Sequence, residues 1–386
     1  MVVDSRQFET LEARRLYSGS SLPDGLSPAQ VRHAYGFDQV KFRMHRRDVL
    51  ADGRGETIAI VDAFAAPTIV NDLKVFDAKF GISDKDSTGK FALTIATPNG
   101  VPPANGSWAS EVSLDVEWAH AIAPGAHVLL VEAASDNTSD LLNAIDYARR
   151  QTGVVAVSMS WGGDESPFET SDDAILTTPR RHYGGNGLRG GVTFVTSSGD
   201  TGAPTSWPAS SPNVVAVGGT TLTTKLDGTW TDESAWSGSG GGPSQIEGTF
   251  APDVAYNADP NTGFAVYDST DDGQGNVGWG TIGGTSAGAP QWAALFSIVA
   301  QGRAYNGLGS LDGPNQSLDG IYTMPQSNFH DIVTGSNGYP AHTGYDLVTG
   351  RGTPLAQKVV PFLITFNSYS SNPRPMTILK SSHSVF

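Results

Sequence analysis

Residues 127–160 read HVLLVEAASDNTSDLLNAIDYARRQTGVVAVSMS and alternate a strand pattern with a helix pattern. The runs at 127–132 and 154–160 are short, apolar and rich in β-branched residues, as in strands buried on both faces of a parallel sheet. Between them, residues 138–150 have a helical period, with Thr138 or Ser139 as the expected N-cap. One face of this helix carries its apolar side chains, Leu141, Leu142, Ile145 and Ala148.

The same alternation continues on both sides of this stretch. Further apolar runs occupy residues 57–62, 192–196 and 214–217. Further helical patterns occupy residues 108–122 and the segment from just after Ser286 through Val299. The chain is therefore predicted to be an α/β protein with a mainly parallel, doubly wound sheet flanked by helices. Functional sites in such sheets form at the carboxyl ends of the strands, where Asp62, Trp161 and Asp200 lie.

The 386 residues are expected to form one large domain, because strand and site patterns run through most of the chain. We place this domain at residues 28–366, after a flexible leader at 1–27 and before a polar tail at 367–386. The glycine-rich run at 237–244 is interpreted as a loop inside the domain rather than a linker. Residues 8–16 resemble a short leader motif found near the start of some exported bacterial proteins; a disordered polar terminus is the alternative.

Composition excludes several classes of function. The formal net charge of −15 gives a surface that repels nucleic acid and anionic lipid, so neither is an expected partner. No stretch approaches the ~20 consecutive apolar residues of a membrane span. Because there are no cysteines, thiol catalysis, disulfides and cysteine–zinc sites are excluded. A monomer is expected, since no coiled-coil pattern appears.

The segment at 283–290, GGTSAGAP, is followed at once by an apolar helix. Its small residues permit a tight turn, and Pro290 is tolerated in the first turn of a helix. Ser286 is therefore expected at a helix N-terminus, where the dipole and the N–H groups favour developing negative charge. The alternative is a serine that only caps the helix after a glycine turn.

A serine hydroxyl needs a base to act as a nucleophile. None of the eight histidines lies in an obvious catalytic motif, and His120 is interpreted as a boundary residue. Glu111 and Asp115 are better candidates, because their i, i+4 spacing puts them on one helix face. Two carboxyls held together beside an apolar wall titrate as a coupled pair, so one can accept the serine proton while the other orients it. A solvated acidic helix face is the alternative.

A third element, Ser197–Gly202, ends a strand with Asp200 in a glycine turn. A protonated Asp can donate a hydrogen bond to an oxyanion, whereas an ionised one would repel it. Asp200 is therefore a candidate oxyanion donor at acid pH. An Asp that merely caps a turn is the alternative.

These elements together resemble the sedolisin family of serine-carboxyl peptidases, particularly its kumamolisin-like branch. The family's Glu-x-x-x-Asp, Ser-Gly-Asp and Gly-Thr-Ser-x-x-x-Pro motifs match residues 111–115, 198–200 and 284–290 in the same order. Further similarity lies at 121–125, 158–162, 240–242 and 252–254. The resemblance covers about residues 28–357 and implies a subtilisin-like fold for the catalytic domain.

The resemblance also implies a role for each matched residue. Ser286 would attack the peptide carbonyl, Glu111 would act as base and then acid, and Asp115 would hold Glu111. Asp200 would stabilise the oxyanion with the Ser286 backbone N–H. In the kumamolisin-like branch an additional acidic residue and a tryptophan extend the network behind the catalytic Glu, and Asp62 and Trp161 occupy these positions. A strand-end carboxylate and a packing tryptophan are the alternatives.

A calcium site is expected near the end of the domain. Calcium takes about six to eight oxygen ligands, which Asp331, Asp346 and nearby loop carbonyls could supply. Sedolisins carry such a site, and the resemblance implies side-chain ligands from both Asp residues and backbone oxygens from Ile332, His342 and Gly344. His342 replaces a glycine of the family pattern, and an acidic turn without metal is the alternative.

The resulting prediction is a secreted or extracytoplasmic endopeptidase that acts in acid and loses activity by neutral pH. Family members usually carry a long prosegment, whereas fewer than 30 residues precede the domain in this sequence. We therefore expect either a trimmed chain or a different control of activity. Two rival functions are a catalytically silent, calcium-dependent binding module and a glycosidase-type hydrolase that uses Glu111 and Asp115.

Overall fold

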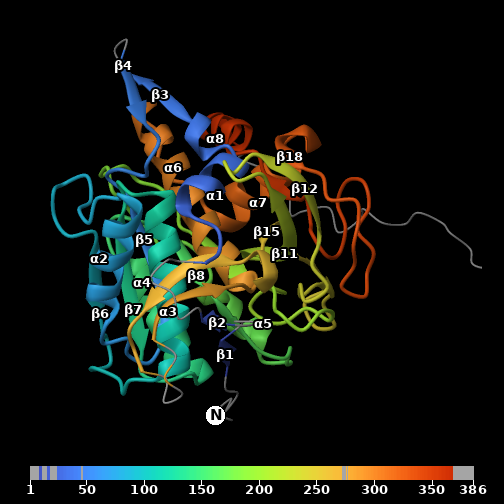
Figure 1. Cartoon of the computed structure of the whole chain (residues 1–386), viewed down its shortest axis with the longest axis horizontal. Coiled ribbons are helices and arrows are strands. Elements are labelled where there is room, and N and C mark those ends of the chain that lie inside the picture. Colours follow the sequence, from blue (N-terminus) through green and yellow to red (C-terminus); the bar gives the residue numbers. More distant parts are fainter. Residues whose placement is uncertain are drawn as a thin grey trace, which may run out of the picture.

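The centre of the molecule is a twisted, mostly parallel β-sheet with helices on both faces (Figure 1). The computed structural model describes residues 8–10, 15–17, 24–44, 47–271, 275 and 277–367. Strands in the sheet follow the order β12-β11-β10-β8-β5-β7-β6, and β15 pairs with β11. Every pairing along this path is parallel except that of β11 with β12. The predicted α/β class with a mainly parallel sheet is therefore confirmed.

The apolar runs of the sequence form the inner strands. Their bounds are β5 (Thr57–Ala63), β7 (His127–Ala133), β8 (Val154–Met159), β10 (Thr193–Ser197) and β11 (Val214–Thr224). The outer strands of the sheet are β6 (Leu93–Ala96), β12 (Trp230–Ala235) and β15 (Val254–Asn257). Adjacent strands β5, β8 and β10 end at one edge of the sheet, so residues that follow them are brought together.

Two helices pack on one face of the sheet and one on the other. Helices α3 (Gly106–Ile122) and α6 (Gly288–Tyr305) pack against each other and against the inner strands. Side chains of α3 and α6 share a core with Ile58 and Ile60, whereas Ala59 and Val61 pack in the core under α4 (Thr138–Arg150). This alternation along β5 is what a strand buried on both faces produces.

The start of α4 differs from the prediction. Asn137 is its N-cap rather than Thr138 or Ser139, and no side chain caps the helix end. Thr138 is buried in the first turn of the helix. The predicted helix itself, residues 138–150, is confirmed with its apolar face turned inward.

Smaller elements surround this core. The helices are α1 (Pro28–Ala34), α2 (Ile69–Phe80), α5 (Glu169–Asp172), α7 (Leu318–Thr323) and α8 (Ala356–Thr365). The paired strands are β3 (Lys41–Met44) with β4 (Arg47–Leu50), β13 (Gly242–Pro243) with β14 (Phe250–Ala251), β16 (Phe264–Asp268) with β17 (Gly278–Ile282), and β18 (Phe329–His330) with β19 (Thr353–Pro354). The β3–β4 hairpin projects from the body of the molecule (Figure 1).

The described pieces of the expected leader are paired with the rest of the protein. Strand β1 (Glu9–Thr10) pairs with β9 (Trp161–Gly162), and β2 (Arg15–Tyr17) pairs with β17. The backbone of these residues is thus paired with strands of the rest of the protein. The domain boundaries themselves stay a prediction, and residues 1–7 and 368–386 lie outside the described part.

The glycine-rich segment at 237–244 runs beside the sheet. The Gly240 N–H donates to the Gly199 carbonyl over 2.7 Å, and the Ser198 hydroxyl donates to the Gly240 carbonyl over 2.9 Å. The segment thus packs on the turn that carries Asp200. Among the described residues, no helix is long and apolar enough to cross a membrane.

Candidate active site

The turn that carries Ser286 requires glycines. Ser286 lies on a short 3-10 turn, η4 (Thr285–Ala287), that runs directly into α6, and its side chain is fully buried. Gly284 has a φ of 118°, which side-chain-bearing residues rarely adopt. A Cβ on Gly283 would lie 2.5 Å from the Pro260 backbone. The predicted tight turn before a helix is confirmed, and it brings Ser286 to the carboxyl edge of the sheet.

Ser160 connects the turn that carries Ser286 to α3, the helix that carries Asp115. Its hydroxyl donates to Asp115 Oδ2 over 2.7 Å and lies 3.2 Å from the Ser286 carbonyl oxygen. Ser160 follows β8 directly and is fully buried. Sequence reasoning did not single out this residue, although it lies inside the run 158–162 that carries part of the family resemblance.

The carboxylates of α3 are enclosed by the protein. Glu111 and Asp115 are both fully buried, and the helix that carries them packs against η4 and β5. A solvated acidic helix face is therefore excluded. Burial raises the pKa of Asp115 well above its ordinary value, and the nearby Asp62 carboxylate raises it further.

Asp62, at the end of β5, adds a third buried carboxyl group to those of Glu111 and Asp115. It lies opposite Glu132 in the parallel pairing of β5 with β7, so the two side chains leave the sheet on the same side. Among the described residues, neither oxygen of Asp62 has a hydrogen-bond donor. Burial, with a smaller contribution from Glu132, raises the pKa of Asp62 to about 7.

Glu132 was not predicted as a site residue. Its carboxylate accepts a hydrogen bond from the Ala66 N–H over 3.0 Å, and burial raises its pKa. A signal was available in the sequence, because the strand patterns at 57–62 and 127–132 both end in a carboxylate. Aligned parallel strands bring such residues together.

Trp161 contacts the backbone beside Asp62 rather than its carboxylate. The indole N–H donates to the Val61 carbonyl over 2.7 Å. The tryptophan is fully buried, and its ring lies against Phe8. Trp161 and Asp62 are thus brought together as neighbours, but no hydrogen bond joins their side chains.

Asp200 is attached to the residue that precedes Ser286. Its Oδ1 accepts from the Thr285 N–H over 2.7 Å and from the Thr285 hydroxyl over 2.8 Å. The Thr285 hydroxyl also lies 3.2 Å from the Gly199 carbonyl oxygen. Two short hydrogen bonds therefore fix the Asp200 carboxyl beside the turn that carries Ser286.

Comparison with known proteins agrees with this arrangement. The model of the subtilase family matches residues 103–313, more than half of the chain. Kumamolisin from Bacillus sp. (strain MN-32) is 30% identical over 391 aligned residues, which cover 90% of this chain and 65% of that protein. The chain belongs to the sedolisin family, within the subtilases.

Other sedolisin-family proteins align over much of the chain. Sedolisin from Pseudomonas sp. (strain 101) is 27% identical over 77% of this chain and 56% of that protein. Tripeptidyl-peptidase 1 from Dictyostelium discoideum is 27% identical over 76% of this chain and 52% of that protein. The chain thus spans about two thirds or less of the length of these curated relatives.

A solved structure of Pseudomonas sedolisin, a serine-carboxyl proteinase in complex with two molecules of pseudo-iodotyrostatin, shares the fold. The TM-score is 0.68 at 24% identity, and the match covers 89% of this chain and 99% of that one. The expected subtilisin-like architecture is therefore confirmed.

The loop in which this sedolisin-family chain was expected to bind calcium gathers the predicted residues. The Gly344 N–H donates to Asp331 Oδ1 over 3.0 Å, and the His342 N–H donates to Asp346 Oδ2 over 3.1 Å. Asp346 is only 1% exposed and also accepts from the Val348 and Thr349 backbone. All of these partners are neutral.

This donor set fits an oxygen-liganded cation. Within the described ranges, no group of three or more His, Asp or Glu side chains is placed to hold a metal. An ion here would therefore depend on Asp331, Asp346 and backbone carbonyls, a mixture that calcium accepts. A buried carboxylate with only neutral partners would gain from a cation beside it.

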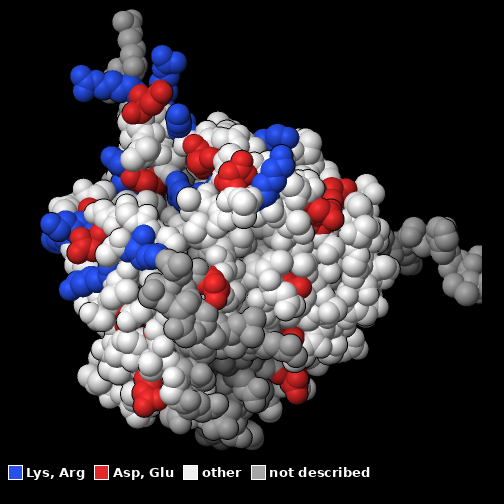
Figure 2. Space-filling view, viewed as in Figure 1, with Lys and Arg blue, Asp and Glu red and all other residues white. Residues whose placement is uncertain are grey.

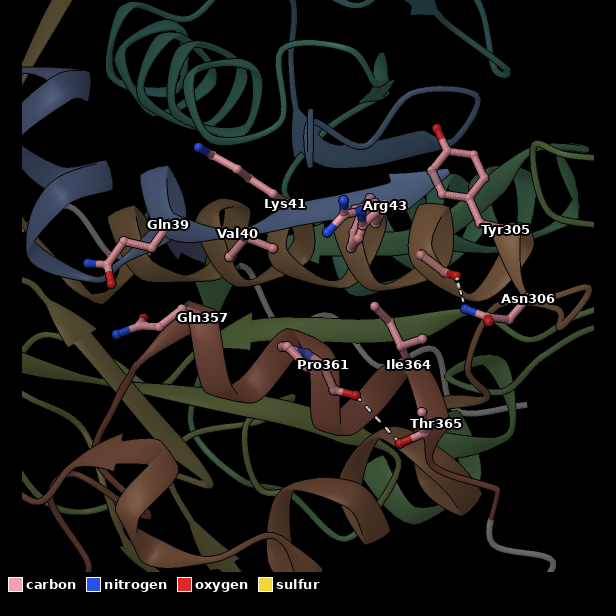
Figure 3. Close-up of a pocket in the computed structure, with 12 residues that line it drawn as sticks. Gln39, Val40, Lys41, Arg43, Tyr305, Asn306, Gln357, Pro361, Ile364 and Thr365 are labelled. Atoms are coloured by element: carbon pink, nitrogen blue, oxygen red, sulfur yellow. Dashed lines mark hydrogen bonds between the residues drawn. The ribbon is translucent and has the colours of Figure 1, made fainter. Parts of the chain in front are cut away.

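A separate cavity lies far from Ser286. A hollow of about 570 Å³ opens between β3, the C-terminal end of α6 and α8 (Figure 3). None of its lining residues is Asp, Glu or His, so it offers neither a carboxylate nor an imidazole. The rise along α6 puts this end about 25 Å from the turn of Ser286. On the face in Figure 2, basic side chains gather on and near the β3–β4 hairpin beside this hollow, including Lys41 and Arg43.

His120 also lies outside the candidate site. It was expected at a boundary, but it is fully buried. Its Nε2 lies 2.9 Å from the Ser83 carbonyl oxygen and 3.5 Å from Asp77 Oδ2. These contacts hold α3 to α2 and give His120 no position next to Ser286.

Proposed function

We propose that the chain is a serine-carboxyl endopeptidase that hydrolyses peptide bonds in acid. The observation that carries this proposal is the connection from the Ser286 backbone carbonyl through the Ser160 hydroxyl to Asp115, because it joins the glycine turn that carries the serine to buried carboxylates. Membership of the sedolisin family supports the same chemistry. A binding module or a glycosidase would leave this arrangement of serine and carboxylates without a role.

In the proposed reaction Ser286 Oγ attacks the carbonyl carbon while Glu111 takes the hydroxyl proton. The tetrahedral intermediate then collapses, the C–N bond breaks, and Glu111 returns the proton to the leaving amine. Water enters next and gives a proton to Glu111 as it attacks the acyl-enzyme. Collapse of that intermediate releases the acid and returns the proton to Ser286. Asp115, held by Ser160, orients Glu111 throughout.

Asp200 is proposed to stabilise the oxyanion together with the Ser286 backbone N–H. Its Oδ1 already accepts two hydrogen bonds from Thr285, so the proton would sit on Oδ2. A carboxyl group donates in this way only while it is protonated. The reaction therefore requires an ionised Glu111 beside a protonated Asp200, a combination that disappears as the pH rises.

Asp62 and Trp161 are proposed as the outer part of this network. Asp62 places a second buried carboxyl group beside Asp115, and Trp161 fixes the strand end that carries Asp62. Both are positioning residues in this proposal, since neither would touch the substrate carbonyl.

One structural calcium ion is proposed in the C-terminal loop. Asp331 and Asp346 would bind it through carboxylate oxygens, and Ile332, His342 and Gly344 through backbone carbonyls. The ion would supply positive charge that fixes this loop to the domain.

The site of action is proposed to be secreted or extracytoplasmic. An enzyme that needs a protonated Asp200 would be idle at the neutral pH of a cytoplasm. Its substrates are proposed to be proteins or peptides, acted on by a monomer without nucleic acid or membrane. Fractionation of producing cells, followed by detection of the chain in the medium or the cytosol, tests the location.

The main test is cleavage of casein or denatured haemoglobin between about pH 3 and 8, for wild type and Ser286→Ala. Acid-peaked cleavage that is lost in the variant is the expected result. Activity that survives in Ser286→Ala would favour a carboxylate-only hydrolase. No cleavage by wild type, with calcium present, would favour the silent binding module.

The endopeptidase mode needs its own test, because a tripeptidyl-peptidase is among the relatives. A peptide with a blocked N-terminus should be cut internally by an endopeptidase. Release of three-residue products from a free N-terminus, with no cleavage of the blocked peptide, would overturn this part of the proposal.

A further inference from the structure

The β3–β4 hairpin differs in charge from the rest of the molecule. Residues 41–50 hold four basic residues and one acid, whereas the whole chain holds 24 basic and 39 acidic residues. Lys41, Arg43 and Arg47 are exposed, and among the described residues their side chains have no ion pair. Asp48, the acid of the hairpin, lies opposite Arg43 in the ladder. The hairpin is therefore a local basic surface, with charges available to a partner, on an acidic protein (Figure 2).

The strand β3 has an outer edge that borders the hollow between β3, α6 and α8. The hairpin is a sheet of two strands, so in the described part of the chain the edge of β3 away from β4 pairs with no strand. Residues 39–43 line the hollow and no residue of β4 does, so this outer edge faces it. The other strand is attached to the body, because Gln301 Nε2 donates to the Leu50 carbonyl over 2.8 Å. An unpaired edge offers N–H and C=O groups to another extended chain.

The two faces of β3 carry different chemistry. Lys41 and Arg43 leave the strand on one face and Phe42 on the other, since side chains alternate along a strand. The Phe42 ring lies 5.8 Å from the Tyr305 ring at the end of α6, and Ile364 of α8 lines the same hollow (Figure 3). An extended chain along the outer edge would therefore meet positive charge on one face and apolar side chains on the other.

Charge decides which kind of chain fits this edge. A second copy of β3 would bring Lys41 and Arg43 against like charges, which opposes pairing. A strand with carboxylates at alternate positions would instead place one opposite each of these two residues. The side chain between the carboxylates would then point to the face of Phe42, where an apolar group is favoured. Backbone pairing along a sheet edge with pockets for alternate side chains is a known way to bind a polypeptide.

We propose that the outer edge of β3 is a docking site for an extended acidic segment of a partner polypeptide, with carboxylates opposite Lys41 and Arg43 and an apolar side chain in the hollow. The length of α6 puts this site about 25 Å from the turn of Ser286, so a docked segment leaves the candidate active site free. The inference goes beyond the proposed function and does not depend on catalysis by Ser286.

The first test measures binding of a blocked, fluorescent peptide in which glutamate alternates with leucine. The full chain carries Ser286→Ala to prevent cleavage, and the pH is about 6, where glutamate is ionised. Reversing both charges in Lys41→Glu/Arg43→Glu should weaken binding at least about tenfold, because two attractive pairs become repulsive. The double variant Lys79→Glu/Lys85→Glu makes the same change in net charge at two exposed lysines that do not line the hollow, and it should bind like the parent.

A second test asks whether the peptide binds as a strand with a side chain in the hollow. Two peptides N-methylated at adjacent residues should differ in affinity by about tenfold, since only alternate N–H groups of an added strand point to β3. Thr365→Trp, which adds bulk on the α8 side of the hollow, should weaken binding about threefold or more while every charge stays in place. Thermal melts check that each variant is folded, and Lys41→Gln/Arg43→Gln replaces the charge reversal if that variant unfolds.

The outcomes separate this inference from the proposed function. Peptide binding with the expected losses supports the docking site even if wild type cleaves nothing. No binding by the parent, or equal losses in the hairpin and control variants, would overturn the inference and leave the proposed function standing. Inorganic polyphosphate that binds as tightly as the peptide, with no difference between the two methylated peptides, would show a general anion surface and would also overturn it.

Discussion

The Ser160 hydroxyl donates to Asp115 Oδ2 over 2.7 Å, so a residue at the end of a sheet strand holds a carboxylate that comes from a helix. This bond lowers the pKa of Asp115, in opposition to burial and to the charge of Asp62, which both raise it. The same hydroxyl lies near the Ser286 carbonyl. A single small side chain therefore contacts both the carboxylate of Asp115 and the turn that carries Ser286.

Replacing Ser160 with alanine should lower kcat by about tenfold to a hundredfold. A buried carboxylate that loses its donor costs about 1–3 kcal/mol, and here the cost falls on the group that orients Glu111. The pKa of Asp115 should rise, so the acid limb of the kcat profile should move to higher pH. Steady-state kinetics from pH 3 to 7 measure both effects.

Ser158→Ala is the matched control for Ser160→Ala. Ser158 is a buried serine of β8 whose hydroxyl has no hydrogen-bond partner among the described residues. Ser158→Ala should leave kcat and its pH profile unchanged. An equal loss in both variants would show that the effect is general damage to β8.

Stability should fall as the pH rises because of Asp62. Its folded-state pKa of about 7 lies well above the ~3.9 of an unfolded Asp, so the native state binds the proton more tightly. The contribution of Asp62 to the free energy of unfolding is therefore complete below about pH 4. It is lost as the pH rises through 7, and the free energy of unfolding falls by up to about 4 kcal/mol. Urea unfolding at several pH values should reveal this slope, and Asp62→Asn should flatten it. An unchanged slope in Asp62→Asn would assign the pH dependence to other buried carboxyls.

Glu132→Gln tests whether the charge of Glu132 on β7 affects the neighbouring carboxyl of Asp62 on β5. Glutamine keeps an oxygen for the Ala66 N–H but removes the negative charge that raises the pKa of Asp62. The pKa of Asp62 should fall, so the loss of stability between about pH 4 and 7 should shrink. The same urea series measures this change. A steeper slope in Glu132→Gln would contradict the charge coupling across the paired strands.

The sequence predicted the sheet well because parallel strands buried on both faces are apolar throughout, as in residues 57–62 and 127–132. The catalytic candidates were also accessible, since each motif is local. Contacts between segments far apart in the sequence could not be predicted in this way. Ser160 and Asp115 are 45 residues apart, and nothing in their local sequence indicates that the strand end reaches the helix. The pairing of β1 with β9 was missed for the same reason, because two residues in a polar segment carry no strand pattern.

Asp200→Asn should separate the donor role of Asp200 from its negative charge. The amide can still accept from Thr285 through oxygen and donate through nitrogen, as a protonated carboxyl would, but it does so at any pH. Asp200→Asn should therefore retain more activity than Asp200→Ala, and its pH profile should extend toward neutral pH. Cleavage of one peptide by the three proteins measures this. A profile for Asp200→Asn that falls at the same pH as wild type would show that another group sets the basic limb.

Removal of calcium should destabilise the C-terminal loop and then the domain. An ion that binds only the folded state adds about 2.7 kcal/mol at one hundred times its Kd, so EDTA should lower the Tm of wild type and added calcium should restore it. Asp331→Asn should shrink this calcium-dependent shift, because one of two carboxylate ligands would lose its charge. Asp24→Asn, which changes an exposed acid, is the matched control and should behave like wild type. If EDTA and calcium leave the Tm of wild type unchanged, Asp331 and Asp346 form an acidic turn whose hydrogen bonds to Gly344 and His342 suffice without an ion.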